Sequence, residues 1–326
     1  MLVFLYIYTM VTQNSLLIKL TLNRLSFIAL SLLTTLFCIP VQSQDLEPRF
    51  LSSIPTGTNV AIASYGYSKG NILLDNSAPI EDLNASLNNA IFAYAHSFKL
   101  FNKLTKFDVV APYSFAEFTG ALNKIDTSTT RNGFGDPLLR ISMILTGSPP
   151  LKPADFVKHE KEKFKLGVFL RVRVPVGQYD SNKLINLGSN RWAFKIGMAG
   201  SYTIKKKLIF EAHLNSWLFT KNNNYFRGNS SFQKPIYGAQ FHTGYIFKPG
   251  VWIAGSIGKT FGGKIEINNV EQEIDVNNSR YGLTFAYRVA KKHTLKVVYT
   301  NGFSTRAGTD FNTFLLVYQY VWFDKK

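Results

Sequence analysis

The chain of 326 residues contains a single cysteine, Cys38. This cysteine lies inside an apolar run, residues 26–39, which we predict to be removed on export. The remaining chain, residues 44–326, has no cysteine. Disulfide bonds, a thiolate nucleophile and a cysteine-based metal site are therefore excluded. An exported protein of this size without disulfides needs another source of stability, such as a large core or closed β-pairing.

The apolar run has the length and the flanks of a signal peptide. Two basic residues precede it, and "PVQSQD" follows it, with Val41 and Ser43 at the −3 and −1 positions of a cleavage site. We predict a cleaved signal peptide over residues 1–43, with Met10 as an alternative start. A membrane anchor is the other interpretation, but the run is short for a bilayer-spanning helix and is broken by Ser and Thr.

Charged residues are scarce, and acidic residues are the scarcer kind. Asp, Glu, Lys and Arg make up 17% of the chain, against about 25% in average soluble proteins. The 37 basic and 20 acidic residues give a net charge of +17. Anionic solutes and anionic lipid suit such a chain as partners, whereas export argues against nucleic acid.

The sequence also lacks a long amphipathic helix. Instead, short segments alternate apolar and polar side chains with a period of two, which is typical of β-strands. The clearest, "LGVFLRVRV", places Arg171 and Arg173 on one face and Leu and Val on the other. In "SRYGLTFAYRV", Arg280 and Arg288 share a face opposite Tyr, Leu and Phe. We predict about twelve strands, centred on residues 58–68, 88–99, 106–117, 133–146, 164–176, 191–204, 208–220, 235–247, 250–261, 279–289, 293–301 and 313–323.

Short and long connections alternate between these strands. The short ones include "KKK", "KPG" and "AKKH", and a longer link, residues 148–162, interrupts the pattern. The long ones are residues 69–87, 118–132, 177–190, 221–234, 262–278 and 302–312. Outer-membrane barrels have short periplasmic turns, long external loops and both termini in the periplasm. We therefore predict an all-β fold, a transmembrane antiparallel up-and-down β-barrel of about 12 strands over residues 58–326, preceded by a periplasmic segment, residues 44–57.

Aromatic residues gather near the predicted strand ends, as in the interfacial girdles of membrane barrels. The predicted periplasmic girdle contains Tyr245, Phe247, Trp252, Tyr320, Trp322 and Phe323. The predicted external girdle contains Tyr113, Phe115, Trp192, Trp217 and Phe219. The alternative is that these are ordinary core aromatics of a soluble β protein.

Charged residues on the strands are expected to point into the barrel, because a charge that faces lipid is costly. The predicted pore-lining or solute-binding set is Arg140, Arg171, Arg173, Lys195, Glu211, His213, Gln240, His242, Arg280, Arg288 and Lys296, with Gln319. Most of these residues are basic, and a basic lumen raises the local concentration of anions. The alternative is a structural network in which the arginines hold groups of the wall or the loops.

Motifs of known catalytic chemistry are absent: the sequence has no G-x-S-x-G, no H-E-x-x-H and no P-loop. His213 and His242 are expected on adjacent strands and have the chemistry of metal ligands. Such a pair is more often hydrogen-bonded inside a lumen, so we predict neither metal nor cofactor. A barrel that hydrolyses lipid needs an outward serine beside a histidine. His293 has no obvious serine partner, so we predict no enzyme.

The most polar stretch, "GQYDSNKLINLGSNRW" at residues 177–192, is predicted to form an external loop at the mouth. Its candidate residues are Gln178, Tyr179, Asp180, Asn186, Asn190, Arg191 and Trp192. Asn, Asp, Ser and Gly hydrogen-bond their own backbone, so we expect a loop that holds its shape. In it, Asp180 would pair with Arg191 and Trp192 would anchor the interface. The alternative is an entrance that selects solutes. Asp136 in "GFGDPLLR" is expected to shape a turn.

Three stretches of the chain resemble a bacterial family. They are "RNGFGDPLLRISMILTG", "VPVGQYDSNKLINLGSNRWAFKIGMAG" and "RYGLTFAYRVAKKHTLKVVYTNGFSTRAGTDFNTFLLVYQYVW". The family is the group of outer-membrane transporters labelled "putative meta-pathway of phenol degradation". The resemblance implies an outer-membrane β-barrel associated with the uptake of aromatic or other hydrophobic small molecules. The C-terminus departs from the usual aromatic ending of outer-membrane proteins, since Asp324, Lys325 and Lys326 follow Phe323.

These features favour an outer-membrane channel for passive uptake of small, aromatic or anionic solutes. Its expected partners are outer-membrane lipid, the small-molecule solute and the barrel-insertion machinery. One alternative is a structural or surface-recognition barrel, because twelve strands leave a narrow bore that side chains can plug. A less favoured alternative is a barrel enzyme that hydrolyses lipid.

Overall fold

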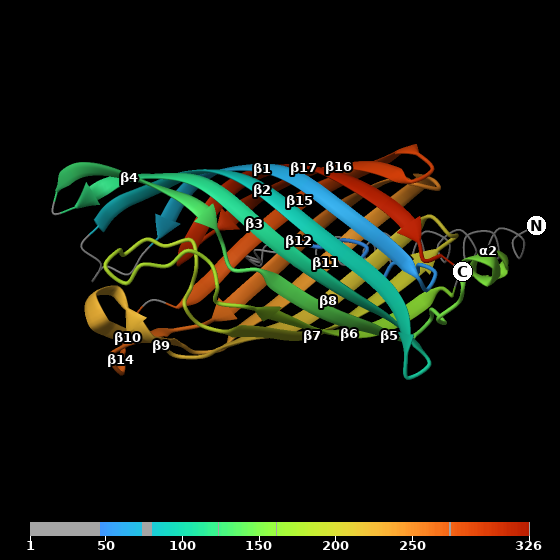
Figure 1. Ribbon diagram of the computed structural model, residues 1–326, viewed down its shortest axis with the longest axis horizontal. Coiled ribbons are helices and arrows are strands. Elements are labelled where there is room, and N and C mark those ends of the chain that lie inside the picture. The colour runs from blue at the N-terminus through green and yellow to red at the C-terminus, as the bar shows by residue number, and fades with distance from the viewer. Residues whose placement is uncertain (1–45, 74–79, 123, 161, 274, 326) are drawn as a thin grey trace, which may run out of the picture. The chain divides into compact units, whose positions relative to one another are not determined.

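Long β-strands form one closed antiparallel barrel (Figure 1). The computed structural model describes residues 46–325 except 74–79, 123, 161 and 274. The predicted signal peptide lies outside the described residues. The barrel strands are β1 (Thr58–Leu73), β2 (Ile80–Leu100), β3 (Lys103–Leu122), β4 (Ile125–Phe134), β5 (Leu138–Thr146), β6 (Phe164–Arg173), β7 (Ala193–Ile204), β8 (Leu208–Phe219), β11 (Ile236–Lys248), β12 (Val251–Gly262), β15 (Val276–Ala290), β16 (His293–Ser304) and β17 (Gly308–Phe323).

The first and last strands close the barrel. β1 pairs with β17 along its whole length, starting at Thr58↔Phe323, and with β2 on its other side. β4 and β5 share one position in the sheet, because β5 pairs with the first half of β3 and β4 with the second half. The chain leaves the ladder between them around Asp136 and Pro137, where proline has no backbone N–H to donate. The barrel thus has twelve strand positions, which confirms the predicted fold.

The two ends of the barrel differ. The turn end carries the connections at residues 101–102, 205–207, 249–250 and 291–292, together with the first residue of β1 and the last of β17. The helix α2 (Pro153–Lys158) follows β5 at the same end (Figure 1). The loop end carries a second, four-stranded sheet, the loop-end sheet, with strand order β14-β13-β10-β9. Its elements are β9 (Asn222–Tyr225), η1 (Phe226–Gly228), β10 (Asn229–Gln233), β13 (Ile265–Ile267) and β14 (Val270–Glu271). None of the described helices is long and apolar enough to cross a membrane.

Three predicted loops are largely strand, so this part of the prediction was wrong. In one of them, residues 302–312, β16 runs to Ser304 and β17 starts at Gly308. β1 continues to Leu73 and β2 starts at Ile80, within the expected loop 69–87. β3 and β4 likewise form a hairpin through most of residues 118–132. The side chains of β4 are mostly exposed and polar. Because neither face of such a hairpin needs to meet lipid, its sequence lacks the apolar alternation by which the other strands were found.

The outer face of the barrel wall is apolar. In β15, Tyr281, Leu283 and Phe285 are 39%, 50% and 41% exposed, while the intervening Gly282 and Thr284 are buried. Alternation of this kind places every second side chain inside the barrel. An exposed apolar band around the wall suits the hydrocarbon core of a membrane.

Three of the aromatic residues assigned to the girdles point inward, so their assignment was wrong. Trp252 is 7% exposed and lies within 4.8 Å of the Arg49 guanidinium. Trp217 and Phe219 lie on the face of β8 that also carries buried His213. Whether a strand side chain faces the lumen or the outside depends on its position in the alternation along the chain, and not on its residue type. A cation over the ring gives each aromatic a favourable partner inside the lumen.

Candidate functional site in the barrel lumen

The N-terminal segment, residues 46–57, makes its contacts inside the barrel. The backbone N–H groups of Phe50 and Leu51 donate to the Glu211 carboxylate, at N···O distances of 2.8 and 3.3 Å. Lys106 Nζ donates to two carbonyl oxygens of the segment at 2.8 and 3.2 Å. Leu51 is buried in a small apolar cluster with side chains of β3, β5 and β7. This segment was expected in the periplasm, and nothing in its sequence predicted these contacts.

Glu47 connects the N-terminal segment to charged residues of the wall. Its carboxylate accepts hydrogen bonds from Arg140 Nη1 and Arg171 Nη2. Arg140 Nε also donates to Asp108 Oδ1 at 2.8 Å. Burying such ions costs solvation free energy, which is offset only when each charge is paired and hydrogen-bonded. The cluster therefore ties β3, β5 and β6 to the N-terminal segment as one unit.

The ring of Phe50 lies among cations and other rings. The Arg140 guanidinium is 5.1 Å and Lys106 Nζ 5.7 Å from its centroid. The rings of Phe169 and His213 meet it edge-on, with centroids 5.2 and 5.4 Å away. Both arrangements are favourable for an aromatic ring. Residues from β3, β5, β6 and β8 thus converge on one side chain of the N-terminal segment.

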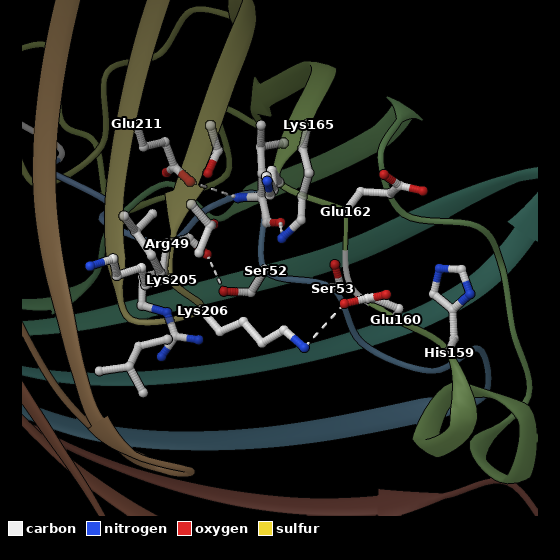
Figure 2. A pocket seen from close by; sticks show the side chains of 16 residues that line it. Arg49, Ser52, Ser53, His159, Glu160, Glu162, Lys165, Lys205, Lys206 and Glu211 are labelled. Atoms are coloured by element: carbon white, nitrogen blue, oxygen red, sulfur yellow. Dashed lines mark hydrogen bonds and ion pairs between the residues drawn. The ribbon is translucent and has the colours of Figure 1, made fainter.

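A cavity of about 440 Å³ lies at the turn end and is called the turn-end cavity (Figure 2). Its basic lining residues are Arg49, Lys163, Lys165, Lys205 and Lys206, and its acidic ones Glu160, Glu162 and Glu211. Lys206 pairs with Glu160 at 3.1 Å, and Lys165 Nζ donates to a carbonyl oxygen of the N-terminal segment at 3.3 Å. The cavity is large enough for a small organic molecule.

Toward the loop end, beside Phe50, the space is far smaller. This second cavity measures about 10 Å³, and its lining is Glu47, Phe50, Arg140, Phe169, Arg171, Lys195, His213, Asn215 and Gln240. One water molecule needs about 10–15 Å³ of such volume. The N-terminal segment therefore leaves room for about one water in this part of the lumen.

Cationic and aromatic side chains alternate in the loop-end half of the lumen. Arg173 and Lys195 lie 5.2 and 5.5 Å from the ring of Trp217. Arg191 lies 4.6 Å from the ring of Phe219. Burial and the neighbouring Arg173 lower the pKa of Arg191 to about 10, which leaves its guanidinium charged at neutral pH. This half of the lumen offers positive charge and flat apolar surface at the same place.

The other predicted lumen residues fall into two groups. Arg280 is buried and donates through Nη2 to the carbonyl oxygen of Phe311 at 3.0 Å. Lys296 Nζ lies over the ring of Trp252, which points into the lumen, at 5.8 Å from the ring centroid. Arg288 differs, since it is exposed and its backbone N–H donates to Gly250 O beside a hairpin turn. Arg288 therefore lies at the turn end and not in the middle of the lumen.

Glu211, His213 and His242 form a buried polar cluster on β8 and β11. His213 Nε2 and Glu211 Oε1 are 2.8 Å apart, and the two imidazole centroids are 4.7 Å apart. His242 Nδ1 lies 2.8 Å from Ser256 Oγ. The expected hydrogen bonds of the two histidines are thus present. The same three residues could hold a metal ion, since one ligand atom of each lies within 4.8 Å of the others.

Asp136 holds both ends of the loop formed by residues 177–190. Its Oδ1 accepts the backbone N–H of Gly177 at 2.9 Å. Its Oδ2 accepts the backbone N–H and the hydroxyl of Ser189 at 2.8 and 2.6 Å. A charged acceptor makes stronger hydrogen bonds than a neutral one. Asp136 therefore has a wider structural role than the turn that the sequence predicted.

The expected ion pair between Asp180 and Arg191 is not formed, so that prediction was wrong. Asp180 pairs with Lys183 at 3.3 Å, and its backbone exchanges hydrogen bonds with the Asn186 side chain at 2.8 and 3.0 Å. Arg191 Nη2 instead donates to Gln233 Oε1 at 2.6 Å. Asp180 finds its partners within its own turn, whereas Arg191 points to the lumen.

The remaining residues of the loop motif bind neighbouring segments. The backbone N–H of Gln178 donates to the last residue of β4 at 2.8 Å, and Tyr179 Oη donates to a carbonyl of β9 at 2.9 Å. Asn190 Nδ2 donates to Asn222 Oδ1 at 2.9 Å. Trp192 is 43% exposed on the outer face. The loop is thus fixed to its surroundings at several points.

Comparison with known proteins agrees with this geometry. The family model described as "Putative MetA-pathway of phenol degradation" matches residues 66–320. The chain belongs to this family. A search of curated proteins finds no significant match.

A solved structure with a TM-score of 0.73 shows the same fold for this family member. An outer membrane channel from Pseudomonas putida F1 is 20% identical, with a TM-score of 0.73 over 85% of this chain and 100% of that one. The β domain of the Bordetella autotransporter BrkA is 13% identical, with a TM-score of 0.48 over 82% of this chain and 100% of that one. The KdgM porin is 9% identical, with a TM-score of 0.42 over 79% of this chain and 98% of that one. The last two similarities are too low to carry an argument.

The family match begins at residue 66 and so leaves out the N-terminal segment. Glu47 and Phe50, which this member of the family places among the lumen residues, were missed by sequence reasoning. Their stretch has no periodic pattern. The one available signal is that two acidic residues, a basic residue and an aromatic residue follow the predicted cleavage site closely, in "DLEPRF".

Proposed function

We propose that the protein is an outer-membrane channel for passive uptake of small organic anions, aromatic carboxylates in particular. The observation that carries the proposal is the pairing of cations with aromatic rings in the lumen: Arg173 and Lys195 with Trp217, and Arg191 with Phe219. The N-terminal segment occupies the lumen beside Phe50, where the cavity measures about 10 Å³.

An aromatic carboxylate matches this lining in both of its parts. Its carboxylate suits guanidinium and ammonium groups, and its ring suits the flat faces of Trp217 and Phe219. Cationic groups outnumber the carboxylates of Glu47, Asp108 and Glu211 among the lumen residues named above. Positive charge in a narrow, low-dielectric tube concentrates anions. Diffusion down a gradient needs no nucleotide-binding motif.

Permeation requires the N-terminal segment to move, because about one water fits beside Phe50. The segment is held by the Glu47 ion pairs and by the hydrogen bonds to Glu211 and Lys106. It is not a strand of the barrel, so its release leaves every pair of neighbouring wall strands intact. The barrel can therefore open without unfolding.

The test is a flux measurement on purified protein in liposomes. Benzenesulfonate and phenyltrimethylammonium have similar size and fixed opposite charges, so both cross protein-free liposomes slowly. We expect benzenesulfonate to permeate faster through the protein, and the combined Arg173→Met and Lys195→Met variant to reduce this advantage. Lys99→Met, an exposed position near the β2–β3 turn, serves as the control. Equal rates for the two solutes in the wild type would contradict the proposal.

The second candidate is a barrel that is permanently plugged and has a structural or recognition role. The observation in its favour is the cavity of about 10 Å³ beside Phe50. Planar-bilayer recording of the intact protein separates the two candidates, and deletion of residues 46–53 is the control that should open either one. A channel should open with the segment present, whereas a permanently plugged barrel should conduct only after the deletion.

A further inference from the structure

Glu211 and His213 on β8 and His242 on β11 occupy one small patch of the inner wall. Glu211 and His213 are two positions apart and therefore share a face of their strand. The register pairs His242 with Glu211 and Gln240 with His213. All three side chains are nearly inaccessible, with 2%, 5% and 2% exposure. Backbone pairing between two rigid strands thus presents a carboxylate and two imidazoles to the same point.

The distances between the three side chains suit a metal ion that all three would bind. One ligand atom of each residue lies within 4.8 Å of the others. In a tetrahedral zinc site, with bonds of about 2.1 Å, ligand atoms lie roughly 3.4 Å apart. Small side-chain rotations would close the difference, and His213 Nε2 already lies 2.8 Å from Glu211 Oε1. Two imidazoles with one carboxylate is a ligand set that divalent transition metals use.

His242 supplies the independent observation. Its Nε2 is buried and has no hydrogen-bond partner among the described residues. Its other ring nitrogen, Nδ1, lies 2.8 Å from Ser256 Oγ. If Nδ1 carries the proton and donates to Ser256, Nε2 carries a lone pair, as a metal-ligating imidazole does. A buried nitrogen without a partner costs free energy, and a bound cation would remove that cost.

The carboxylate is also held as a ligand would be. Glu211 accepts the backbone N–H groups of Phe50 and Leu51, and ligating carboxylates are commonly fixed by such bonds. A carboxylate has about four lone-pair sites. Glu211 can therefore bind a metal and keep the N-terminal segment in place.

We propose that Glu211, His213 and His242 form a binding site for a divalent transition metal, with Zn²⁺ as the best match. The site adjoins the turn-end cavity, which Glu211 lines (Figure 2). The cations of Arg49 and Lys106 lie close enough to Glu211 to interact with its charge. Their repulsion weakens cation binding, so we expect an affinity in the micromolar range and not the tighter affinity of a closed structural zinc site.

The test titrates ZnCl₂ into the full mature protein, folded in detergent, by isothermal calorimetry. We expect one equivalent to bind in the wild type. His213→Ala and His242→Ala should each weaken binding by about 100-fold or more, since even outer-shell changes cost about 10–100-fold. Glu211→Gln, which keeps one of the two acceptor oxygens that Phe50 and Leu51 use, should weaken it as well. His96→Ala and His293→Ala, which remove histidines outside the cluster, should leave it unchanged.

A second measurement needs no variant. Co²⁺ added to the wild-type protein should give the visible absorption bands of a low-symmetry nitrogen and oxygen site, and Zn²⁺ should abolish them. Absence of these bands overturns the proposal, even where a cluster variant fails to fold. It is also overturned if Zn²⁺ binding is not stoichiometric, or if His242→Ala binds as tightly as His293→Ala in barrels shown to be folded by heat-modifiable migration.

Discussion

The closure around Phe50 and the mouth around Asp136 both depend on carboxylates, and the two regions use them differently. Glu47 lies on a segment outside the barrel sheet and binds two guanidinium groups of the wall. Asp136 lies between the wall strands β4 and β5 and binds backbone N–H groups and a hydroxyl of one loop. The first arrangement can be undone while the sheet stays intact. The second is part of the sheet's own connection, so its loss affects the fold.

The largest effect should follow from Glu47→Gln. The change removes the Glu47 carboxylate from its ion pairs with Arg140 and Arg171, and breaking a buried ion pair from one side is costly. Because the Glu47 side chain keeps 35% of its surface accessible, we expect a loss of about 2–3 kcal/mol of segment binding. That corresponds to roughly 30–150-fold in the ratio of open to closed channels. Single-channel recording in planar bilayers measures it.

Glu117→Gln is the matched control, since Glu117 is an exposed residue of β3. Unchanged gating in both variants would show that the ion pairs do not hold the closure, and the contrast between the two regions would disappear.

A smaller effect, on stability and not on gating, is expected for Asp136→Ala. The variant loses three hydrogen bonds to a charged acceptor. The loop can regain some of them with water, so we expect a loss of about 2 kcal/mol of unfolding free energy. Urea unfolding in lipid vesicles, followed by tryptophan fluorescence, measures it. Asp180→Ala, which affects a solvent-exposed pair within the same loop, should leave the unfolding midpoint nearly unchanged.

Arg191→Met connects the two regions, since Arg191 leaves the loop and enters the lumen. The variant keeps apolar contact with Phe219 and removes one charge from the path. We expect anion-over-cation permeability to fall by about 3–5-fold, consistent with the loss of about 1 kcal/mol of attraction. Reversal potentials in a KCl gradient measure it. Arg288→Met, at the exposed turn end, should change the ratio less, and an equal change would place the selective region elsewhere.

The smallest effect is expected in the loop-end sheet. Hydrogen bonds from Lys234 and Lys264 hold the pKa of Glu271 at about 2, below its ordinary value of 4.5. This pairing therefore contributes stability above pH 4.5, and the contribution is lost as the pH falls from 4.5 to 2. The site is exposed, so the contribution is small and screened by salt.

Hydrogen exchange of residues 229–233 and 265–271, corrected for intrinsic rates, should rise slightly between pH 4.5 and 2. Glu271→Gln should show this faster exchange already at pH 5. Exchange in the wild type that is independent of pH would show that the ion pairs contribute nothing.

The barrel wall was predictable because lipid on one face and lumen on the other impose a strict alternation. This is why β6 and β15 were recognised from "LGVFLRVRV" and "SRYGLTFAYRV". The hairpin of β3 and β4 was missed beyond residue 118, because the alternation ends where the lipid ends. Trp252 and Trp217 were misplaced because the presence of an aromatic near a strand end was given more weight than its position in the alternation.

The partners of the charged residues were harder to predict from the sequence than the side of the wall on which they lie. Arg171 and Lys195 were correctly expected on the face opposite the apolar side chains. Nothing in their spacing indicates that Glu47, 124 residues before Arg171, forms the ion pair. Asp180 and Arg191 were paired because they are close in sequence, yet each has a nearer partner in space.

The sequence by itself determined the class of fold, the number of strand positions and the side of the wall on which most side chains lie. These follow from local periodicity and connection length, which any stretch of chain reveals on its own. The tertiary structure alone decided that the N-terminal segment lies in the lumen, that Asp136 closes the mouth loop, and that Glu211, His213 and His242 meet. Each depends on contacts between residues far apart in sequence, whose free energy arises only when the closed barrel removes them from water.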